Sequence, residues 1–156
     1  MKLDKLNIRI DELSDQRVIK FLQDHLQHMR EITPPGCVHA LDIDALKRPE
    51  VTFWTVWDEQ TLICCGALKE LDPRHAELKS MRTAPAHLKQ GVASVLLNHI
   101  ISEAKKRNYK RLSLETGSYE AFVPARNLYE KFGFSYCGPF SDYATSSNHV
   151  FMTIQL

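Results

Sequence analysis

Residues 81–97 read Met-Arg-Thr-Ala-Pro-Ala-His-Leu-Lys-Gln-Gly-Val-Ala-Ser-Val-Leu-Leu and carry the clearest structural signal in the chain. We expect a strand to end near Thr83, a short turn to follow, and a long amphipathic helix to begin near Lys89 to Gly91. A helix N-terminus offers backbone N–H groups without helical partners and a partial positive charge. Glycine at position 91 lets an anion approach that backbone closely. The stretch therefore predicts a site for phosphate, and for a phosphate-bearing cofactor.

The composition around this stretch is that of an ordinary soluble globular protein. The chain has 156 residues, of which 44% are hydrophobic and 25% charged, so we expect one domain spanning residues 1–156. The 20 Lys and Arg against 19 Asp and Glu leave a formal net charge of +1, which gives no overall argument for nucleic acid or an anionic membrane. No apolar run approaches the ~20 residues of a membrane span, and the first residues lack the apolar core of a signal peptide. We therefore expect a cytoplasmic protein with no nucleic-acid or membrane partner.

The residue types that bind metals show no ligand spacing. The cysteines are Cys37, Cys64, Cys65 and Cys137. None of them forms a C-x-x-C pair, so reduced and partly buried thiols are expected rather than a zinc site. His25 and His28 lie three residues apart on a predicted helix and are interpreted as a surface pair. The sequence therefore predicts no metal.

Hydrophobic periodicity predicts the remaining elements. Strands are expected at Leu6–Asp11, Val51–Trp57, Thr61–Leu68, Ala76–Thr83, Arg111–Thr116, Phe134–Cys137 and His149–Ile154. Helices are expected after a cap at Ser14 or Asp15 and up to Thr33–Gly36, at His39–Leu46, from Gly91 to Arg107, and at Ala121–Phe132. Strands that alternate with helices and hairpins favour a mixed sheet covered by helices.

Two short motifs add a family resemblance to this order of elements. They are Lys89-Gln90-Gly91-Val92-Ala93 and Leu128-Tyr129-Glu130-Lys131-Phe132-Gly133-Phe134. The first resembles the acetyl-CoA pyrophosphate motif R/Q-x-x-G-x-G/A of the GNAT N-acetyltransferase superfamily, and the second resembles its L-Y-x-x-x-G-F signature. Short glycine patterns recur by chance, but here both motifs stand in the expected order and the likeness covers nearly the whole chain. The resemblance implies an α/β (α+β) fold, with a mixed, mostly antiparallel sheet of six to seven strands flanked by about four helices.

The resemblance also implies acetyl-CoA as cosubstrate, with no metal. Its pyrophosphate would lie on the N–H groups that open the long helix, and its pantetheine arm would pair with the preceding strand like an added strand. The cofactor-binding residues would be Met81, Arg82, Thr83, Lys89, Gln90, Gly91, Val92, Ala93 and Ser94. The sequence departs from the family pattern at Leu88, the first motif position, and at Phe122, where many relatives carry Asn.

Two residues are candidates for moving protons in acetyl transfer. Glu77 lies eleven residues before Leu88, an offset that resembles the general-base glutamate of some relatives; the alternative is a solvated or salt-bridged strand glutamate, and many relatives use water chains instead. Tyr129 matches the tyrosine that commonly acts as general acid in the family. The alternative, a ring packed beside Phe132 and Phe134, is compatible with that role.

The acceptor side carries weaker signals. Glu115 and Thr116 end a strand and are candidates for binding a cationic acceptor, although a strand end before a capped turn explains them equally well. Arg126 is expected to be exposed, and Trp54 and Trp57 are assigned to the core or to a sheet face. An apolar contact of a homodimer has candidates in Phe140, Tyr143 and Phe151.

The leading hypothesis is therefore an acetyl-CoA-dependent N-acetyltransferase. It would move an acetyl group by direct transfer in a ternary complex to a primary amine of a small molecule, amino acid or peptide. The alternative is a non-catalytic acyl-CoA-binding sensor or regulatory module on the same fold, which the departures at Leu88 and Phe122 leave open. A nucleotide-phosphate protein of another class is disfavoured because the chain lacks G-x-x-x-x-G-K-[ST] and G-x-G-x-x-G.

Overall fold

The structure is a computed structural model that describes residues 1–33 and 43–156. Its helices are α1 (Gln16–Ile32), α2 (Ile43–Leu46), α3 (Val92–Lys106) and α4 (Val123–Lys131). Its strands are β1 (Asn7–Ile10), β2 (Val51–Asp58), β3 (Thr61–Asp72), β4 (His75–Thr83), β5 (Arg111–Gly117), β6 (Ser135–Cys137) and β7 (His149–Gln155). Single 3-10 turns lie at Leu3–Lys5, Pro85–His87 and Glu120–Phe122. The predicted elements are confirmed, except that Pro34–Gly36, Cys37 and the first part of the predicted helix His39–Leu46 lie outside the described residues.

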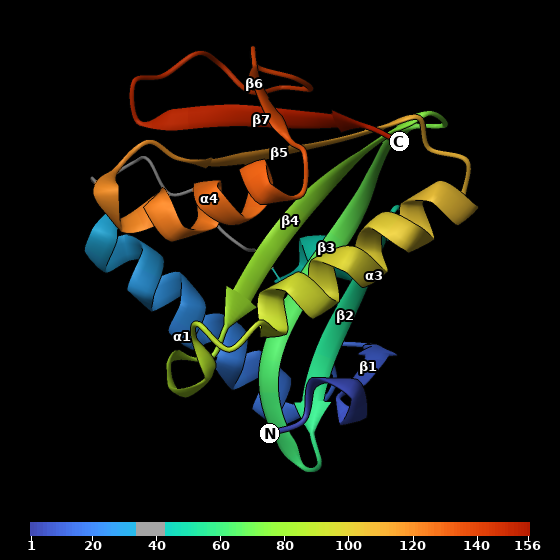
Figure 1. Cartoon of the computed structure of the whole chain (residues 1–156), viewed down its shortest axis with the longest axis vertical. Helices are drawn as coiled ribbons and strands as arrows, with labels where there is room; N and C mark the ends of the chain where they lie inside the picture. Colours follow the sequence, from blue (N-terminus) through green and yellow to red (C-terminus); the bar gives the residue numbers. More distant parts are fainter. Residues whose placement is uncertain (34–42) are drawn as a thin grey trace.

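The strands form one mixed sheet in the order β1-β2-β3-β4-β5-β7-β6 (Figure 1). Its neighbouring strands are antiparallel except for β4 and β5, which are parallel. Parallel neighbours need a crossover connection, and α3 supplies it here. This agrees with the expected mixed, mostly antiparallel sheet flanked by four helices.

The parallel pair separates before either strand ends. Its ladder runs from His75↔Arg111 to Leu78↔Leu114, although β4 continues to Thr83 and β5 to Gly117. Just beyond the last pair, Ser80 has φ 61°, and the pairing of β4 with β3 gains one extra residue on β4. Such a β-bulge bends its strand, and Figure 1 shows β4 running away from β5. The bulge therefore opens a gap in the middle of the sheet.

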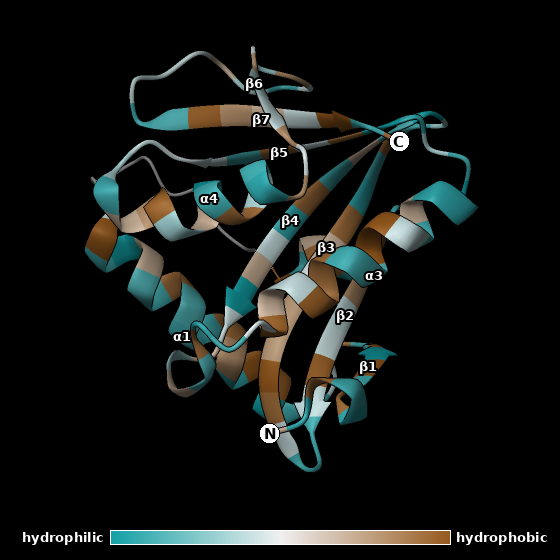
Figure 2. Ribbon diagram, in the orientation of Figure 1, coloured by the Kyte–Doolittle hydropathy of each residue, from teal (hydrophilic) through white to brown (hydrophobic). Residues whose placement is uncertain are grey.

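The two faces of the sheet carry separate apolar clusters. One face is covered by α3 and α4, whose buried side chains pack on alternate residues of the strands, Cys64 and Leu78 among them. The other face is covered by α1 and α2, which pack on Phe53, Trp57 and Cys65. Cys64 and Cys65 thus point to opposite faces, as a strand requires. Figure 2 shows hydrophobic residues on the part of α3 that crosses the sheet and hydrophilic ones at its C-terminal end.

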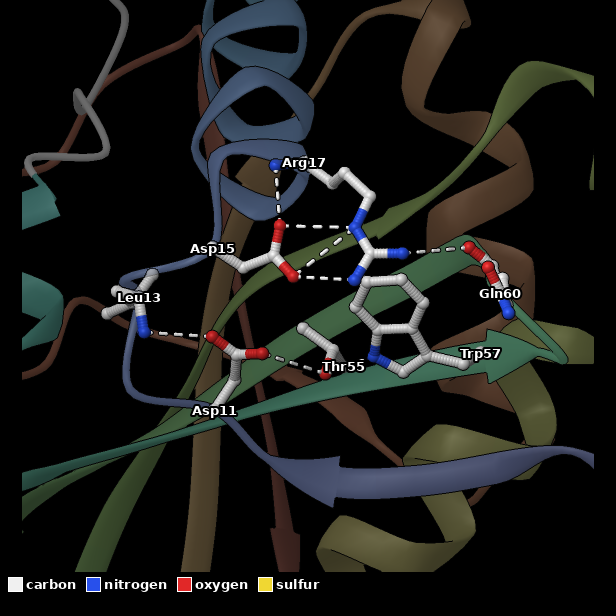
Figure 3. Close-up of polar contacts among 7 residues, drawn as sticks. All are labelled: Asp11, Leu13, Asp15, Arg17, Thr55, Trp57 and Gln60. Carbon is white, nitrogen blue, oxygen red and sulfur yellow. Dashed lines mark hydrogen bonds and ion pairs between the residues drawn. The ribbon is translucent and has the colours of Figure 1, made fainter.

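The start of α1 is fastened to the sheet by a polar cluster (Figure 3). The Asp15 carboxylate caps the helix by accepting from the Arg17 backbone N–H at 2.8 Å and binds the Arg17 guanidinium at 2.7 Å. That guanidinium lies 4.5 Å from the centre of the buried Trp57 ring and donates to the Gln60 carbonyl at 3.2 Å. The cap and the cation–π contact therefore fix where α1 crosses the sheet.

A second chain of contacts joins the same helix entry to β2. Trp57 Nε1 donates to Thr55 Oγ1 at 2.8 Å, and Thr55 Oγ1 donates to Asp11 Oδ2 at 3.3 Å. The other oxygen of Asp11 accepts from the Leu13 N–H at 2.8 Å (Figure 3). Trp57 is thereby a core residue with a satisfied indole, as expected for a sheet-face tryptophan.

The described cysteines are free thiols, and Cys64 and Cys65 are buried. Burial raises the pKa of Cys64 to about 11, so that thiol stays protonated at neutral pH. No helix in the described ranges 1–33 and 43–156 is long and apolar enough to cross a membrane.

Candidate functional site

The predicted phosphate loop leads into an uncapped helix N-terminus. Lys89 and Gly91 both have positive φ, 60° and 86°, and Gly91 is the residue before the first turn of α3. No side chain of the described residues caps that turn, so its backbone N–H groups keep the orientation that binds anions. A Cβ on Gly91 would also lie 3.2 Å from Leu3 Cδ1. The backbone N–H groups from Gln90 to Ser94 therefore have an arrangement that suits an anion such as pyrophosphate.

The side chains of this loop offer fewer groups for binding an anion than its backbone does. Lys89, Gln90 and Gly91 are exposed, whereas Val92, the first residue of α3, is buried. Leu88, at the position where the family pattern has Gln or Arg, is 54% exposed and offers no polar group. Gln90 Nε2 donates to the Ala86 carbonyl at 3.4 Å.

The side chains at the end of β4 point to the two faces of the sheet in turn. The Met81 side chain points beneath α3, where its sulfur would lie 2.5 Å from a Cβ placed on Gly66. The Arg82 guanidinium points to the opposite face, with Nη1 3.4 Å from His25 Nδ1 of α1. Thr83 Oγ1 lies 3.7 Å from Cys64 Sγ. Because β3 pairs with one edge of this segment and β5 pairs no further than Leu78, the other edge faces the gap.

A cavity of about 170 Å³ lies where β4 and β5 separate. Five of the predicted site residues line it: Glu77, Met81, Glu115, Thr116 and Tyr129. The predicted residues Arg82, Thr83, Lys89, Gln90, Gly91, Val92, Ala93 and Ser94 do not line it. The site thus has two parts, the cavity and the N-terminus of α3, joined by the end of β4.

Glu77 is buried and held by two donors. It is 2% exposed, its Oε2 accepts from the Tyr143 hydroxyl at 2.6 Å, and Lys79 Nζ lies 3.2 Å from the same oxygen. A charge in the interior is tolerated when it is paired and hydrogen-bonded. Glu77 is therefore salt-bridged, as one reading of the sequence had it, and it also lines the cavity, as the other reading needs.

Glu115 lies on the β5 side of the same cavity. Its Oε1 is 3.5 Å from His149 Nε2 at the start of β7, and both residues line the cavity. Thr116 follows on the same strand end. The pair gives the β5 side of the cavity a carboxylate and an imidazole.

Tyr129 closes the cavity from α4. It is 7% exposed, and its ring meets Phe134 edge-on at 5.8 Å, which confirms the packing expected from the sequence. Burial, and after it the neighbouring Cys64 and Glu115, raises the pKa of Tyr129. Its hydroxyl therefore stays protonated at neutral pH, and the raised pKa makes it a weaker acid than an exposed tyrosine.

Phe122 and Arg126 shape the loop after β5. The Phe122 ring lies where a side chain on Gly117 would stand, and Phe122 lines the cavity. Arg126, expected to be exposed, is half-buried and donates to the carbonyls of Gly117 and Tyr119 at 2.7 and 2.9 Å. The expectation was wrong because the carbonyls of Gly117 and Tyr119 accept hydrogen bonds from the Arg126 guanidinium. The spacing of residues in the sequence does not reveal these contacts.

One further expectation is corrected on the opposite face. His25, interpreted as a surface histidine, is half-buried and lines the cavity, while His28 is exposed. The aromatic residues offered as candidates for a dimer contact pack on one another within the chain: Phe140 and Phe151 are 8% and 5% exposed, and the Tyr143 ring centre lies 5.3 and 5.6 Å from theirs. These rings form an internal cluster.

Sequence reasoning missed Lys79, Tyr143 and His149. Lys79 shares a strand face with Glu77, so the period of two could have found it. Tyr143 lies in a polar connecting segment 66 residues from Glu77, and no local pattern links the two. In the described residues, no group of His, Cys, Asp and Glu has an arrangement that could hold a metal ion.

Comparisons with known proteins agree with the family resemblance seen in the sequence. The model of the Acetyltransferase (GNAT) family matches residues 16–134 of this chain. The uncharacterized N-acetyltransferase YsnE of Bacillus subtilis (strain 168) is 54% identical over 151 residues, covering 97% of this chain and 100% of that protein. The uncharacterized N-acetyltransferase YedL of Escherichia coli (strain K12) is 45% identical over 149 residues, covering 96% of this chain and 94% of that protein. A solved GNAT family acetyltransferase from Elizabethkingia anophelis with acetyl-CoA bound shares the fold, with a TM-score of 0.74 at 19% identity over 98% of this chain and 99% of that one.

Proposed function

This chain belongs to the acetyltransferase (GNAT) family and is an acetyl-CoA-dependent N-acetyltransferase, and from that premise we propose its reaction in more detail. The acetyl group passes directly from acetyl-CoA to a primary amine of a small molecule, amino acid or peptide while both substrates are bound. The observation that supports this proposal is the cavity where β4 and β5 separate, which has Glu77 on one wall and Tyr129 on another. Holding two reactants in line contributes several kcal/mol, up to roughly 7–11 in ideal cases.

The protein holds the cosubstrate mainly through backbone. The N–H groups at the start of α3 bind the diphosphate, assisted by Lys89 and Gln90 at the exposed loop. The gap-facing edge of Met81 to Thr83 pairs with the pantetheine arm as an added strand would. Acetyl-CoA supplies the thioester that reacts with the amine. A strand N–H directed at the thioester oxygen stabilises the charge that develops there.

Two side chains move the protons. The Glu77 carboxylate accepts a proton from the acceptor's ammonium group, which leaves the nitrogen lone pair available to attack the thioester carbon. As the C–S bond breaks, the Tyr129 hydroxyl donates its proton to the departing sulfur. The attacking nitrogen loses its second proton to solvent as the amide forms. Glu77 then releases its proton to solvent and Tyr129 takes one back, which restores both side chains. Glu115 and Thr116 contact the acceptor on the β5 side, where the carboxylate attracts a cation.

The test is acetyl transfer by the purified chain. The protein is incubated with acetyl-CoA and a defined set of primary amines: 2-phenylethylamine, putrescine, phenylalanine, lysine and a short peptide with a free N-terminus. Release of free thiol is followed, and calorimetry measures binding of CoA. We expect thiol release with at least one class of amine and saturable CoA binding. Absence of both would contradict the proposal, whereas CoA binding without any release would favour the acyl-CoA sensor.

We also propose that residues 1–156 act as one catalytic domain. The match of the family model to residues 16–134 supports this. The segments outside that range include β7, which pairs with β5.

A further inference from the structure

Tyr143, Glu77 and Lys79 form a closed triangle of hydrogen bonds at the cavity. The Tyr143 hydroxyl donates to Glu77 Oε2 at 2.6 Å. Lys79 Nζ donates to the same oxygen at 3.2 Å and to Tyr143 Oη at 3.1 Å. All three residues line the cavity, and the Glu77 side chain is almost fully buried while that of Lys79 is partly exposed. Both donors therefore converge on one oxygen of the proposed base.

The tyrosine ring is held by packing as well as by its hydroxyl. It lies edge-on to Phe140 at 5.3 Å and tilted against Phe151 at 5.6 Å. The segment that carries it, between β6 and β7, is tied to the end of β5 because the Ser118 hydroxyl donates to the Ser147 carbonyl at 2.6 Å and the Ser118 N–H to the Asn148 carbonyl at 3.1 Å. Removing the hydroxyl alone therefore leaves the ring's contacts in place.

We propose that Tyr143 is a positioning residue: by donating to Oε2, together with Lys79, it fixes the Glu77 carboxylate so that the other oxygen meets the acceptor's ammonium group. The inference rests on the proposed function. Burial alone disfavours an ionised carboxylate, and charge-assisted hydrogen bonds from two donors offset that cost. Burial and the nearby Glu77 carboxylate raise the pKa of Tyr143, so its hydroxyl remains a donor across the neutral range.

The test is a double-mutant cycle with Tyr143→Phe, Glu77→Gln and the double variant. It uses the amine of the set above that the wild type acetylates fastest. We expect Tyr143→Phe to lower kcat roughly tenfold or more, the factor typical of a lost hydrogen bond to a charged group, with the KM for acetyl-CoA unchanged. In the Glu77→Gln background the same change should cost nothing further, because residues that act as a unit are not additive. Lys79→Met repeats the cycle with the second donor, should Tyr143→Phe fold poorly.

Tyr136→Phe is the matched control, since Tyr136 donates to Glu130 at 2.7 Å on the exposed strand β6, away from the cavity. It should keep wild-type kcat. An equal loss from Tyr143→Phe in both backgrounds would overturn the positioning role while leaving the proposed function intact. Wild-type kcat in Glu77→Gln would overturn the base assignment and the positioning role together. A wild type that releases no thiol would contradict the proposed function itself.

Discussion

Tyr129 packs in the core and, in the proposed function, also has a chemical task. Its ring contributes to the core between α4 and the sheet, while the residue as a whole lines the cavity. Burial raises the pKa of Tyr129, so its hydroxyl is a weaker acid than that of an exposed tyrosine. Burial at this position therefore serves the packing of the core, and the proposed proton donation depends on where the hydroxyl lies.

Replacing Tyr129 with Phe should separate the two tasks. The ring contacts with Phe134 remain, so we expect the melting temperature and the CoA affinity to stay close to wild type. Loss of the proton donor should lower kcat by about 100-fold, within the usual range for general acid catalysis. Steady-state kinetics and calorimetry measure the two effects. A variant with undiminished kcat would contradict the acid role of Tyr129.

At the scale of elements, the start of α1 matters because this helix brings His25, Leu26 and Met29 to the cavity. Asp15 caps the helix and pairs with Arg17, which in turn stacks on Trp57. The cluster lies at the opposite end of α1 from the cavity. We therefore expect it to affect activity only by fixing the position of the helix.

Asp15→Ala should destabilise the fold by about 1 kcal/mol, the typical value of an N-cap. Urea denaturation measures the free energy of unfolding. Lys20→Ala is the matched control, because Lys20 and Asp24 form an exposed pair on the same helix at 3.1 Å and such pairs contribute little. Equal losses in the two variants would show that the cap has no special effect.

The loop before α3 yields a second prediction at this scale. Gly91→Ala places a Cβ on a residue with φ 86° and close to Leu3, which costs roughly 1–2 kcal/mol of strain. It also narrows the approach to the helix N-terminus, so we expect weaker CoA binding by calorimetry. Gly138→Ala is the control, since a Cβ there meets nothing within 4 Å. CoA affinity that is unchanged in Gly91→Ala would contradict a phosphate site at this loop.

For the whole molecule, His25 links stability to pH. Burial, then the charges of Arg82 and His28, lower the pKa of His25 from 6.5 to about 4. The unfolded chain therefore binds a proton between these values that the folded chain does not. The contribution of His25 to stability is complete above about pH 6.5 and is lost as the pH falls toward 4, with stability rising with pH in that window.

Replacing His25 with Gln should flatten this part of the stability curve. The wild type should lose up to about 3 kcal/mol more than the variant between pH 7 and pH 4. Urea denaturation at a series of pH values measures the difference. His28→Gln, an exposed change one turn further along α1, should behave as the wild type. Parallel curves for the wild type and His25→Gln would contradict the burial of a neutral imidazole.

Much of the fold could be predicted from the sequence, and the features that were not predicted have physical reasons. Period-two and helical spacing predicted the strands and helices because burial imposes those periods locally. Gly91 was found because only a few residue types suit its backbone. The bulge at Ser80 was not predicted, since serine has no marked preference for its conformation. The hydrogen bond between Tyr143 and Glu77 was not predicted because the two residues are distant in sequence.

Because the β4–β5 ladder ends early, only a short run of backbone pairing joins the two halves of the sheet. Four residue pairs, His75 to Leu78 with Arg111 to Leu114, carry the backbone pairing between the half that ends in β1 and the half that ends in β6. The two halves of the sheet are joined through these four pairs, and the cavity lies next to them. A slight rotation of one half of the sheet about these pairs would widen or narrow the cavity, so the length of the ladder bears on how firmly the cavity walls are held relative to one another.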